Sequence, residues 1–334
     1  MTTQELNAAL AGLTAFDGGA PQLPGLASPR DWAVLGEVVE RHGLAPIVSY
    51  QLEYRWPGRY DVPLALRERL LSLYQGLLAD NVYKLVQLKQ LLSHEGMPEV
   101  VLLGAAAVAD AFYPHIAFRP VPELELLVRG DEIPAAIQAF AAGNFRLQSD
   151  PQGARVAVGD NRLTVHLHRG VPGYARPGAA TAALFERGVA ALPYGKRVFR
   201  LAPEDAFLAT VAALATEAFQ VPRIQLVDLR EMALRGARGG EGFWDPQGGA
   251  VLDFTLLASR VRDGELRRAL ACALQLLSTL FPEVSAATRT LAPERSARTK
   301  AALTRLVVDP ALDPRRQSSW RGAQALRRVL LRRG

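Results

Sequence analysis

The chain has 334 residues, of which 49% are hydrophobic and 22% are charged. This composition is typical of a globular protein and excludes a mainly disordered chain, and the length is sufficient for two compact units with their own cores. The single cysteine, Cys272, lies in an apolar helical run without a second thiol, which excludes an internal disulfide and indicates a small buried side chain.

The net charge of +6 comes from the C-terminal end of the chain. Seven arginines and no acidic residue lie between positions 315 and 333, which leaves 32 basic against 33 acidic residues in the remainder. A basic body is typical of a nucleic-acid-binding domain. A neutral body with a basic tail indicates instead an appendage that docks on a partner.

The sequence gives no sign of membrane insertion or export. No apolar run reaches the roughly 18 to 20 residues that a membrane-spanning helix needs. The N-terminus, MTTQELNAALAGL, carries an acidic residue where a signal peptide would carry lysine or arginine. We therefore expect a cytoplasmic protein.

Helical patterns dominate the N-terminal part. After a stretch with several glycines and prolines at 16–29, the spacing predicts a helix over 31–42 and a long leucine-rich helix over 64–92. In the long helix the apolar residues recur at spacings of three and four, which is the pattern of one buried face. The residues of this predicted face are Leu77, Leu78, Val82, Leu85, Val86, Leu88 and Leu92.

Strand patterns begin after Met97 and Pro98. The apolar run 99–103 stops at Gly104 and passes into a small-residue helix, so a strand, a tight turn and a helix follow in order. A second strand is predicted over 123–128.

Further elements follow along the chain. A helix is predicted over 131–142, and three more strands over 145–148, 155–158 and 162–168, the last two joined by a turn at 159–161. From residue 203 onward the patterns are helical, over 203–219, 223–235, 251–262 and 265–281, with a glycine-rich break at 238–249. The sequence therefore predicts an α+β fold in which helices flank a small mixed β-sheet.

An acidic pair and a glycine turn carry the strongest chemical signal. Glu123 and Glu125, at i and i+2 on a strand, point to the same face, as carboxylates do when they hold a divalent metal in many phosphoryl and nucleotidyl transferases. At Leu103-Gly104-Ala105, the missing side chain lets backbone amides approach phosphate oxygens closely. Each signal alone is common in ordinary surfaces and turns, but the two together in this order indicate a phosphate site.

The order of these segments resembles that of the bacterial uncharacterised nucleotidyltransferases of the polymerase-beta-like superfamily. Such proteins typically carry a strand ending in Leu-Leu-Lys-Gly-Ala-Ala, an arginine, a strand Asp-Ile-Asp-Leu-Leu-Val, a strand Val-Asp-Leu-His, and a helical half with Pro-Glu-Asp and Asp-Leu. The matching segments here are 102–106, Arg119, 123–128, 165–168, 203–205 and 228–229. The resemblance covers most of residues 40–285.

The patterns along the chain and the resemblance together predict four regions, and the resemblance implies a nucleotide site. The regions are N-terminal helices at 1–96, a nucleotidyltransferase-like α/β core at 97–200, a C-terminal helical domain at 201–308, and a linker with a basic tail at 309–334. The implied catalytic residues are Glu123, Glu125 and His166. The implied ligands of magnesium or manganese are Glu123 and Glu125, and the implied contacts to a nucleoside triphosphate are Gly104, Ala105 and Arg119.

The departures from the family pattern fall on the catalytic positions. Leu103 stands in place of the motif lysine, Glu123 and Glu125 replace the two aspartates, and His166 replaces the third acid. Magnesium demands near-ideal octahedral oxygens at about 2.0–2.1 Å, and the extra methylene of each glutamate moves the ligand oxygens by roughly one bond length. Loss of the lysine removes a charge that would steady a triphosphate.

These departures leave three interpretations open. The domain is a degenerate nucleotidyltransferase that binds a ligand or a protein partner without turnover, or Glu123 and Glu125 still hold a metal for slow transfer. Since Thr164, His166 and His168 share one strand face, that metal could be a softer ion such as manganese or zinc. In the third interpretation the chain is a scaffold whose active part is the tail.

The tail at 315–334 has the pattern of a basic amphipathic helix. Its apolar residues at helical spacing are Trp320, Ala323, Leu326, Val329 and Leu330, with arginines around them. Such a helix binds an anionic membrane, nucleic acid or a groove on another protein, or packs back onto the body with its arginines solvated. Asp-Pro pairs at 309–310 and 313–314 predict a turn-rich linker before it.

Overall fold

The computed structural model describes residues 1–149, 155–158, 163–237, 252–261 and 265–285 of the protein. The turn predicted at 159–161, the glycine-rich break and the linker with its basic tail lie outside these ranges. Among the described residues, no helix combines the length and the apolar character needed to cross a membrane.

Four helices form the N-terminal part. They are α1 (Thr3–Leu13), α2 (Pro29–Arg41), α3 (Ala45–Tyr50) and α4 (Leu64–Leu92), with a π-helical segment, Gln51–Arg55, after α3. The Thr2 hydroxyl accepts a hydrogen bond from the Glu5 N–H at 3.2 Å and so caps the start of α1. The helix predicted at 64–92 is confirmed at both ends, and the one predicted at 31–42 begins at Pro29.

The buried face of α4 differs in part from the predicted face. Leu85, Leu88 and Leu92 are buried as predicted, but the predicted core positions Val82 and Val86 are 45% and 48% exposed. The buried stripe of α4 instead runs through position 81, which is polar and was not predicted to be in the core.

That polar core position is Asn81. Its side-chain amide donates to the carbonyls of Ile116 and Arg119 at 2.7 and 2.8 Å, and its side-chain oxygen accepts from the Val121 N–H at 3.3 Å. These bonds satisfy backbone groups of a buried loop that has no regular partner. Asn81 therefore fixes the loop that carries Arg119.

The sheet has seven strands in the order β3-β4-β5-β2-β1-β7-β6. Their bounds are β1 (Val100–Leu103), β2 (Leu124–Val128), β3 (Arg146–Ser149), β4 (Arg155–Val158), β5 (Thr164–His168), β6 (Val189–Ala190) and β7 (Val198–Arg200). In the centre, β2 runs antiparallel to β1 and parallel to β5, so the sheet is mixed. The α+β class predicted from the sequence is confirmed.

The two faces of the sheet pack differently. Leu102, Leu126 and Val128 point to a core that also contains residues of α4 and α6 (Ile133–Ala142). Leu103 and Leu127 point to the other face, which is covered by the loop after β5 and by α7 (Ala179–Glu186). Because side chains alternate along a strand, Glu125 lies on the same side of β2 as Leu127, as the sequence predicts.

The C-terminal part is helical. Its helices are α8 (Pro203–Thr216), α9 (Ile224–Ala237), α10 (Phe254–Arg260) and α11 (Glu265–Leu280). The predicted helix 203–219 ends early because Ala218 and Phe219 have φ of 51° and 58°, outside the helical region. Cys272 is buried in α11, as expected.

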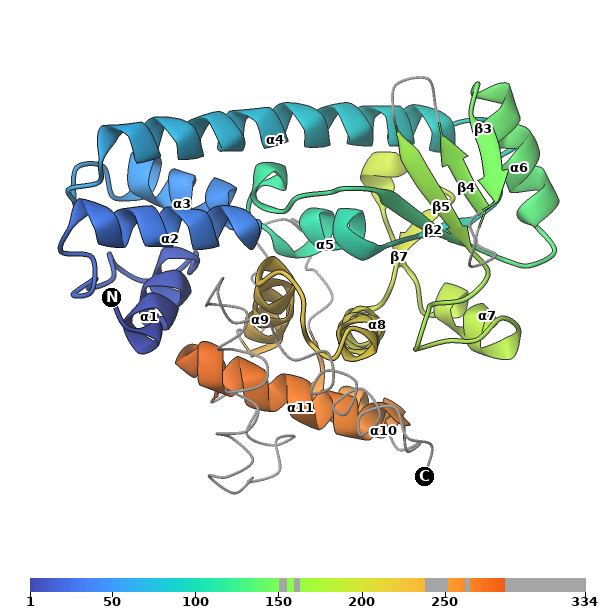
Figure 1. The fold of residues 1–334 in the computed structure, drawn as a ribbon. Coiled ribbons are helices and arrows are strands. Elements are labelled where there is room, and N and C mark those ends of the chain that lie inside the picture. The colour runs from blue at the N-terminus through green and yellow to red at the C-terminus, as the bar shows by residue number, and fades with distance from the viewer. Residues whose placement is uncertain (150–154, 159–162, 238–251, 262–264, 286–334) are drawn as a thin grey trace.

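The N-terminal and C-terminal helices share one core. Leu10 of α1, Val39 of α2, Leu214 of α8 and Leu274 of α11 belong to the same buried cluster. Figure 1 shows α5 (Gly104–Phe112) between α4 on one side and the C-terminal helices on the other. The middle of the chain is thus joined to both ends through α5.

A buried ion pair reinforces this junction. The Arg119 Nε lies 2.9 Å from both carboxylate oxygens of Asp228 on α9, and the Tyr113 hydroxyl donates to Asp228 Oδ1 at 2.6 Å. Burial, reinforced by the charge of Asp228, raises the pKa of Tyr113 well above its usual value, so the phenol stays protonated. Arg119 and Asp228 are only 7% and 2% exposed.

We expect Asp228→Asn to lower the free energy of unfolding by about 3–5 kcal/mol, because it leaves the buried Arg119 guanidinium without a counter-charge. Glu40→Gln is the control, since it breaks the exposed Arg69–Glu40 pair, where the arginine side chain is 66% exposed. The control should lose less than about 1 kcal/mol. Urea unfolding of both variants measures the difference, and equal losses would contradict the role given to Asp228.

Candidate functional site

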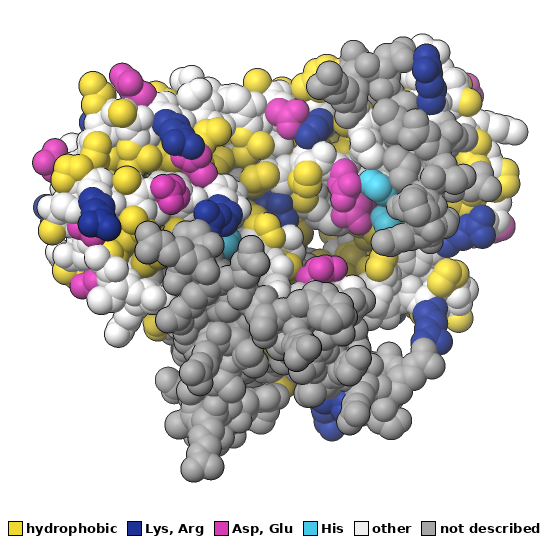
Figure 2. Space-filling view, viewed as in Figure 1, with side chains coloured by type: hydrophobic (Ala, Val, Ile, Leu, Met, Phe, Trp, Pro, Cys, Tyr) yellow, Lys and Arg dark blue, Asp and Glu magenta, His cyan; other side chains and the backbone are white. Residues whose placement is uncertain are grey.

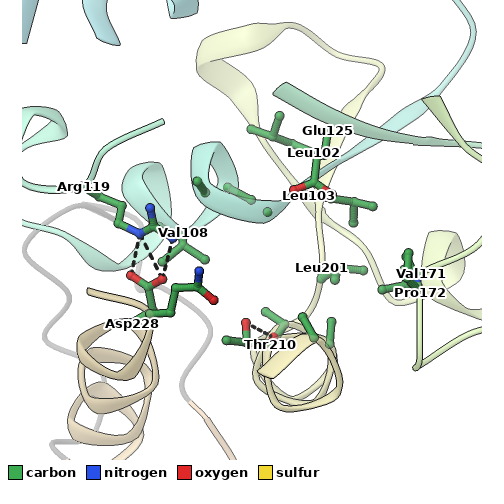
Figure 3. A pocket seen from close by; sticks show the side chains of 18 of the residues that line it. Leu102, Leu103, Val108, Arg119, Glu125, Val171, Pro172, Leu201, Thr210 and Asp228 are labelled. Atoms are coloured by element: carbon green, nitrogen blue, oxygen red, sulfur yellow. Dashed lines mark hydrogen bonds and ion pairs between the residues drawn. The ribbon is translucent and has the colours of Figure 1, made fainter. Parts of the chain in front are cut away.

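A cavity of about 450 Å³ lies between α5 and α8, at the end of β1. Figure 3 shows Leu103, Val108, Leu201 and Thr210 around it, from the strand, α5, the segment before α8 and α8 itself. Most of the lining is apolar, and its size is that of a small-molecule pocket. Glu123, Glu125, Gly104, Ala105 and Arg119, all predicted site residues, line the same cavity.

Gly104 begins α5 with φ of +60°, a conformation that favours glycine. A Cβ at this position would lie 2.0 Å from Oε1 of Glu125. The carboxylate of Glu125 therefore occupies the space beside the turn that the resemblance implies for a phosphate. Gly104 allows the predicted close approach of an anionic group to the backbone, but in this structure that group is the Glu125 carboxylate and not a phosphate.

Two glutamate–histidine pairs stand beside this turn. Nε2 of His166 lies 2.8 Å from Oε2 of Glu123, and Nε2 of His168 lies 3.2 Å from Oε2 of Glu125. Both Nε2 atoms are buried, and their orientation relative to the carboxylates does not meet hydrogen-bond geometry, so each contact is an approach at ion-pair distance. The two imidazole rings are nearly parallel, with centroids 6.3 Å apart.

Strand register brings these residues together. β2 and β5 pair in parallel with Glu125 opposite His166 and Leu127 opposite His168. The structure thus assembles all three predicted catalytic positions, Glu123, Glu125 and His166. It adds His168, which the sequence analysis placed on the same strand face but not among the catalytic residues.

The two carboxylates that the family resemblance implies as ligands of magnesium or manganese each face an imidazole. Magnesium is bound through oxygen ligands in octahedral geometry, whereas both carboxylates here have an imidazole nitrogen at close range. Within the described ranges, no group of three or more His, Cys, Asp or Glu residues could hold a metal ion.

The cations of the cavity are already neutralised. Arg119, predicted to contact a nucleotide, pairs with Asp228, and Arg200 Nη1 lies 3.1 Å from Asp110 Oδ2. At the lysine position, Leu103 is 4% exposed and packs in an apolar cluster. Among the described residues that line the cavity there is no lysine, so a triphosphate would meet two arginines that both pair with aspartates.

The conspicuous Pro-Glu-Asp segment at the start of α8 has a structural role. Asp205 is fully buried and accepts from Arg187 Nε at 2.9 Å and from the Tyr174 hydroxyl, and Arg260 Nη1 lies 3.0 Å from it. Glu204 accepts from the Asp253 N–H at 2.8 Å. These contacts join α8 to α7 and α10, and sequence spacing alone gives no indication of the partners.

We expect Gly104→Ala to destabilise the protein by at least about 1–2 kcal/mol, because alanine resists positive φ and its Cβ would displace the Glu125 carboxylate. The matched control is Gly76→Ala, at an exposed position of α4 with open space around it. The control should gain roughly 0.5–1 kcal/mol. Opposite signs in thermal unfolding support the competition for space at Gly104, and a Gly104→Ala protein of parental stability would refute it.

Comparison with known proteins identifies the family. A family model described as "Uncharacterised nucleotidyltransferase" matches residues 28–282, which is more than half of the chain. The chain therefore belongs to this uncharacterised nucleotidyltransferase family, as the sequence motifs predict. No curated protein and no solved structure matches it.

Proposed function

We propose that this member of the nucleotidyltransferase family has lost nucleotidyl transfer and acts as a binding or regulatory protein. The observation that carries the proposal is the pairing of Glu123 and Glu125 with His166 and His168. In transferases of this kind, carboxylates hold metal ions that clamp the attacking and leaving oxygens. Carboxylates that face imidazoles are poorly disposed for that task.

The surroundings of the pair support the same conclusion. The Glu125 carboxylate lies where a phosphate would approach Gly104, and the apolar Leu103 stands at the lysine position. Nucleotidyl transfer needs positive groups around the triphosphate, because they stabilise the negative charge that develops on its oxygens in the transition state. The fold is retained, while the groups that perform the chemistry are replaced or occupied.

We expect calorimetry with ATP, GTP, CTP and UTP, each with magnesium and with manganese, to detect no metal-dependent binding. A parallel assay should detect no release of pyrophosphate. Glu125→Ala serves as the control, because an active enzyme would lose metal-dependent binding when this ligand is removed. Metal-dependent binding in the parent that disappears in Glu125→Ala would favour the alternative, an active transferase that uses Glu123 and Glu125.

We also propose that the basic tail contributes a docking function, because the entire positive excess of the chain lies within it. A protein that ends at Asp313 should lose binding to anionic vesicles or to RNA, and in the full chain this binding should weaken as salt is raised from low to physiological concentration. Co-sedimentation with vesicles and filter binding with RNA separate the two acidic partners. If the shortened chain binds as well as the full chain, the tail is not the docking segment.

A further inference from the structure

We infer that the cavity between α5 and α8 binds a small hydrophobic organic cation, an amine with an apolar body. This inference rests on the proposed loss of nucleotidyl transfer. It assigns the cavity a ligand whose charge is opposite to that of a nucleotide.

The shape and lining of the cavity suit an apolar body. Small or aliphatic side chains form both walls, including Ala107, Val108 and Ala111 of α5 and Ala209 and Ala213 of α8. The volume of about 450 Å³ lies in the range of pockets that enclose small ligands, which are mainly apolar with a few polar groups that fix orientation. Burial of an apolar ligand here removes its surface from water and supplies the affinity.

The charge of the lining selects a cation. The charged lining residues are the acids Glu123, Glu125, Glu217 and Asp228 and the bases Arg119 and Arg200. Two formal negative charges are therefore in excess. Both arginines pair with aspartates, so the lining formed by the described residues offers no unpaired cation to an anionic ligand.

Two of these carboxylates occupy one end of the cavity. The side chains of Glu123 and Glu125 are 47% and 30% exposed, each lies close to a histidine Nε2, and the Glu125 carboxylate lies beside Gly104. Figure 2 shows acidic and histidine side chains together at the edge of the hollow in the centre of this face. Unlike a metal ion, an ammonium group needs no fixed coordination geometry, so it can bind carboxylate oxygens that also face imidazoles, while the apolar body extends between the two helices.

An isosteric series tests charge apart from shape. Phenylbutylamine, phenylbutanol and phenylbutyrate have nearly the same apolar body and differ in their terminal group. Measured by calorimetry at low salt, the amine should bind at least about tenfold tighter than the alcohol, as expected for a hydrogen bond to a charged partner, and the acid should not bind. Equal binding of amine and alcohol, preference for the acid, or no binding of the amine would each overturn the inference.

Two variants locate the site. Glu123→Lys should weaken binding of phenylbutylamine at least about tenfold and abolish its advantage over phenylbutanol, because the change of two charge units cancels the negative excess of the lining. Glu68→Lys, an equal charge change on the exposed side of α4, should leave the series unchanged. Ala213→Phe places a ring in the cavity from an exposed position of α8 and should weaken amine binding at least about tenfold with unchanged thermal stability.

The results separate this inference from the proposed function. Absence of amine binding together with absence of triphosphate binding overturns the amine ligand alone. Metal-dependent triphosphate binding with pyrophosphate release overturns the proposed function, and the amine inference with it.

Discussion

The ion pair between Arg119 and Asp228 determines how the strand-containing middle of the chain meets the C-terminal helices. Arg119 is held by Asn81 through its backbone and by Asp228 through its side chain, so α4, the loop before β2 and α9 are fixed to one another. Desolvation of such a pair is costly, and two further hydrogen bonds offset part of that cost, one from the Tyr113 hydroxyl to Asp228 and one from Arg119 Nη1 to the Pro120 carbonyl. Arg119 and Asp228 also line the cavity, so their ion pair fixes part of its wall next to α5.

Within that frame the site follows from two adjacent strands and one glycine. The parallel pairing of β2 with β5 places Glu125 beside the histidines of β5, and Glu123 comes directly before the first residue of β2. Positive φ at Gly104 opens the space that the Glu125 carboxylate fills. The acidic end of the cavity is therefore shaped by contacts within the protein, and the apolar walls of α5 and α8 continue from it.

Much of the fold was predictable from the sequence because its signals are local. The bounds of α4, the positions of β1, β2 and β5, and the side of β2 that carries Glu125 all follow from periodicity. β6, β7 and α7 were not predicted, since they are short and β7 is defined by pairing with β1 far along the chain. The burial of Asn81 in α4 was not predicted, because the backbone groups that it bonds lie in a loop far along the sequence.

The candidate site was predictable in composition but not in its contacts. Motif spacing identified Gly104, Glu125 and His166, and the sheet brings them together. The sequence predicted that Arg119 contacts a nucleotide. Its ion pair with Asp228 could not be predicted, because Asp228 lies 109 positions away in the sequence. The approach of His168 to Glu125 depends likewise on strand register, which a single sequence does not reveal.

The shared space of Gly104 and Glu125 also constrains how this sequence can vary. Shortening Glu125 to aspartate alone would withdraw its carboxylate from the turn and from His168, and a side chain at position 104 is excluded while the glutamate remains. Position 104 is therefore coupled through space to position 125 and, through it, to position 168, while position 166 is coupled to position 123. A substitution at one of these positions alone disturbs its partner, so such changes should be better tolerated in combination than singly.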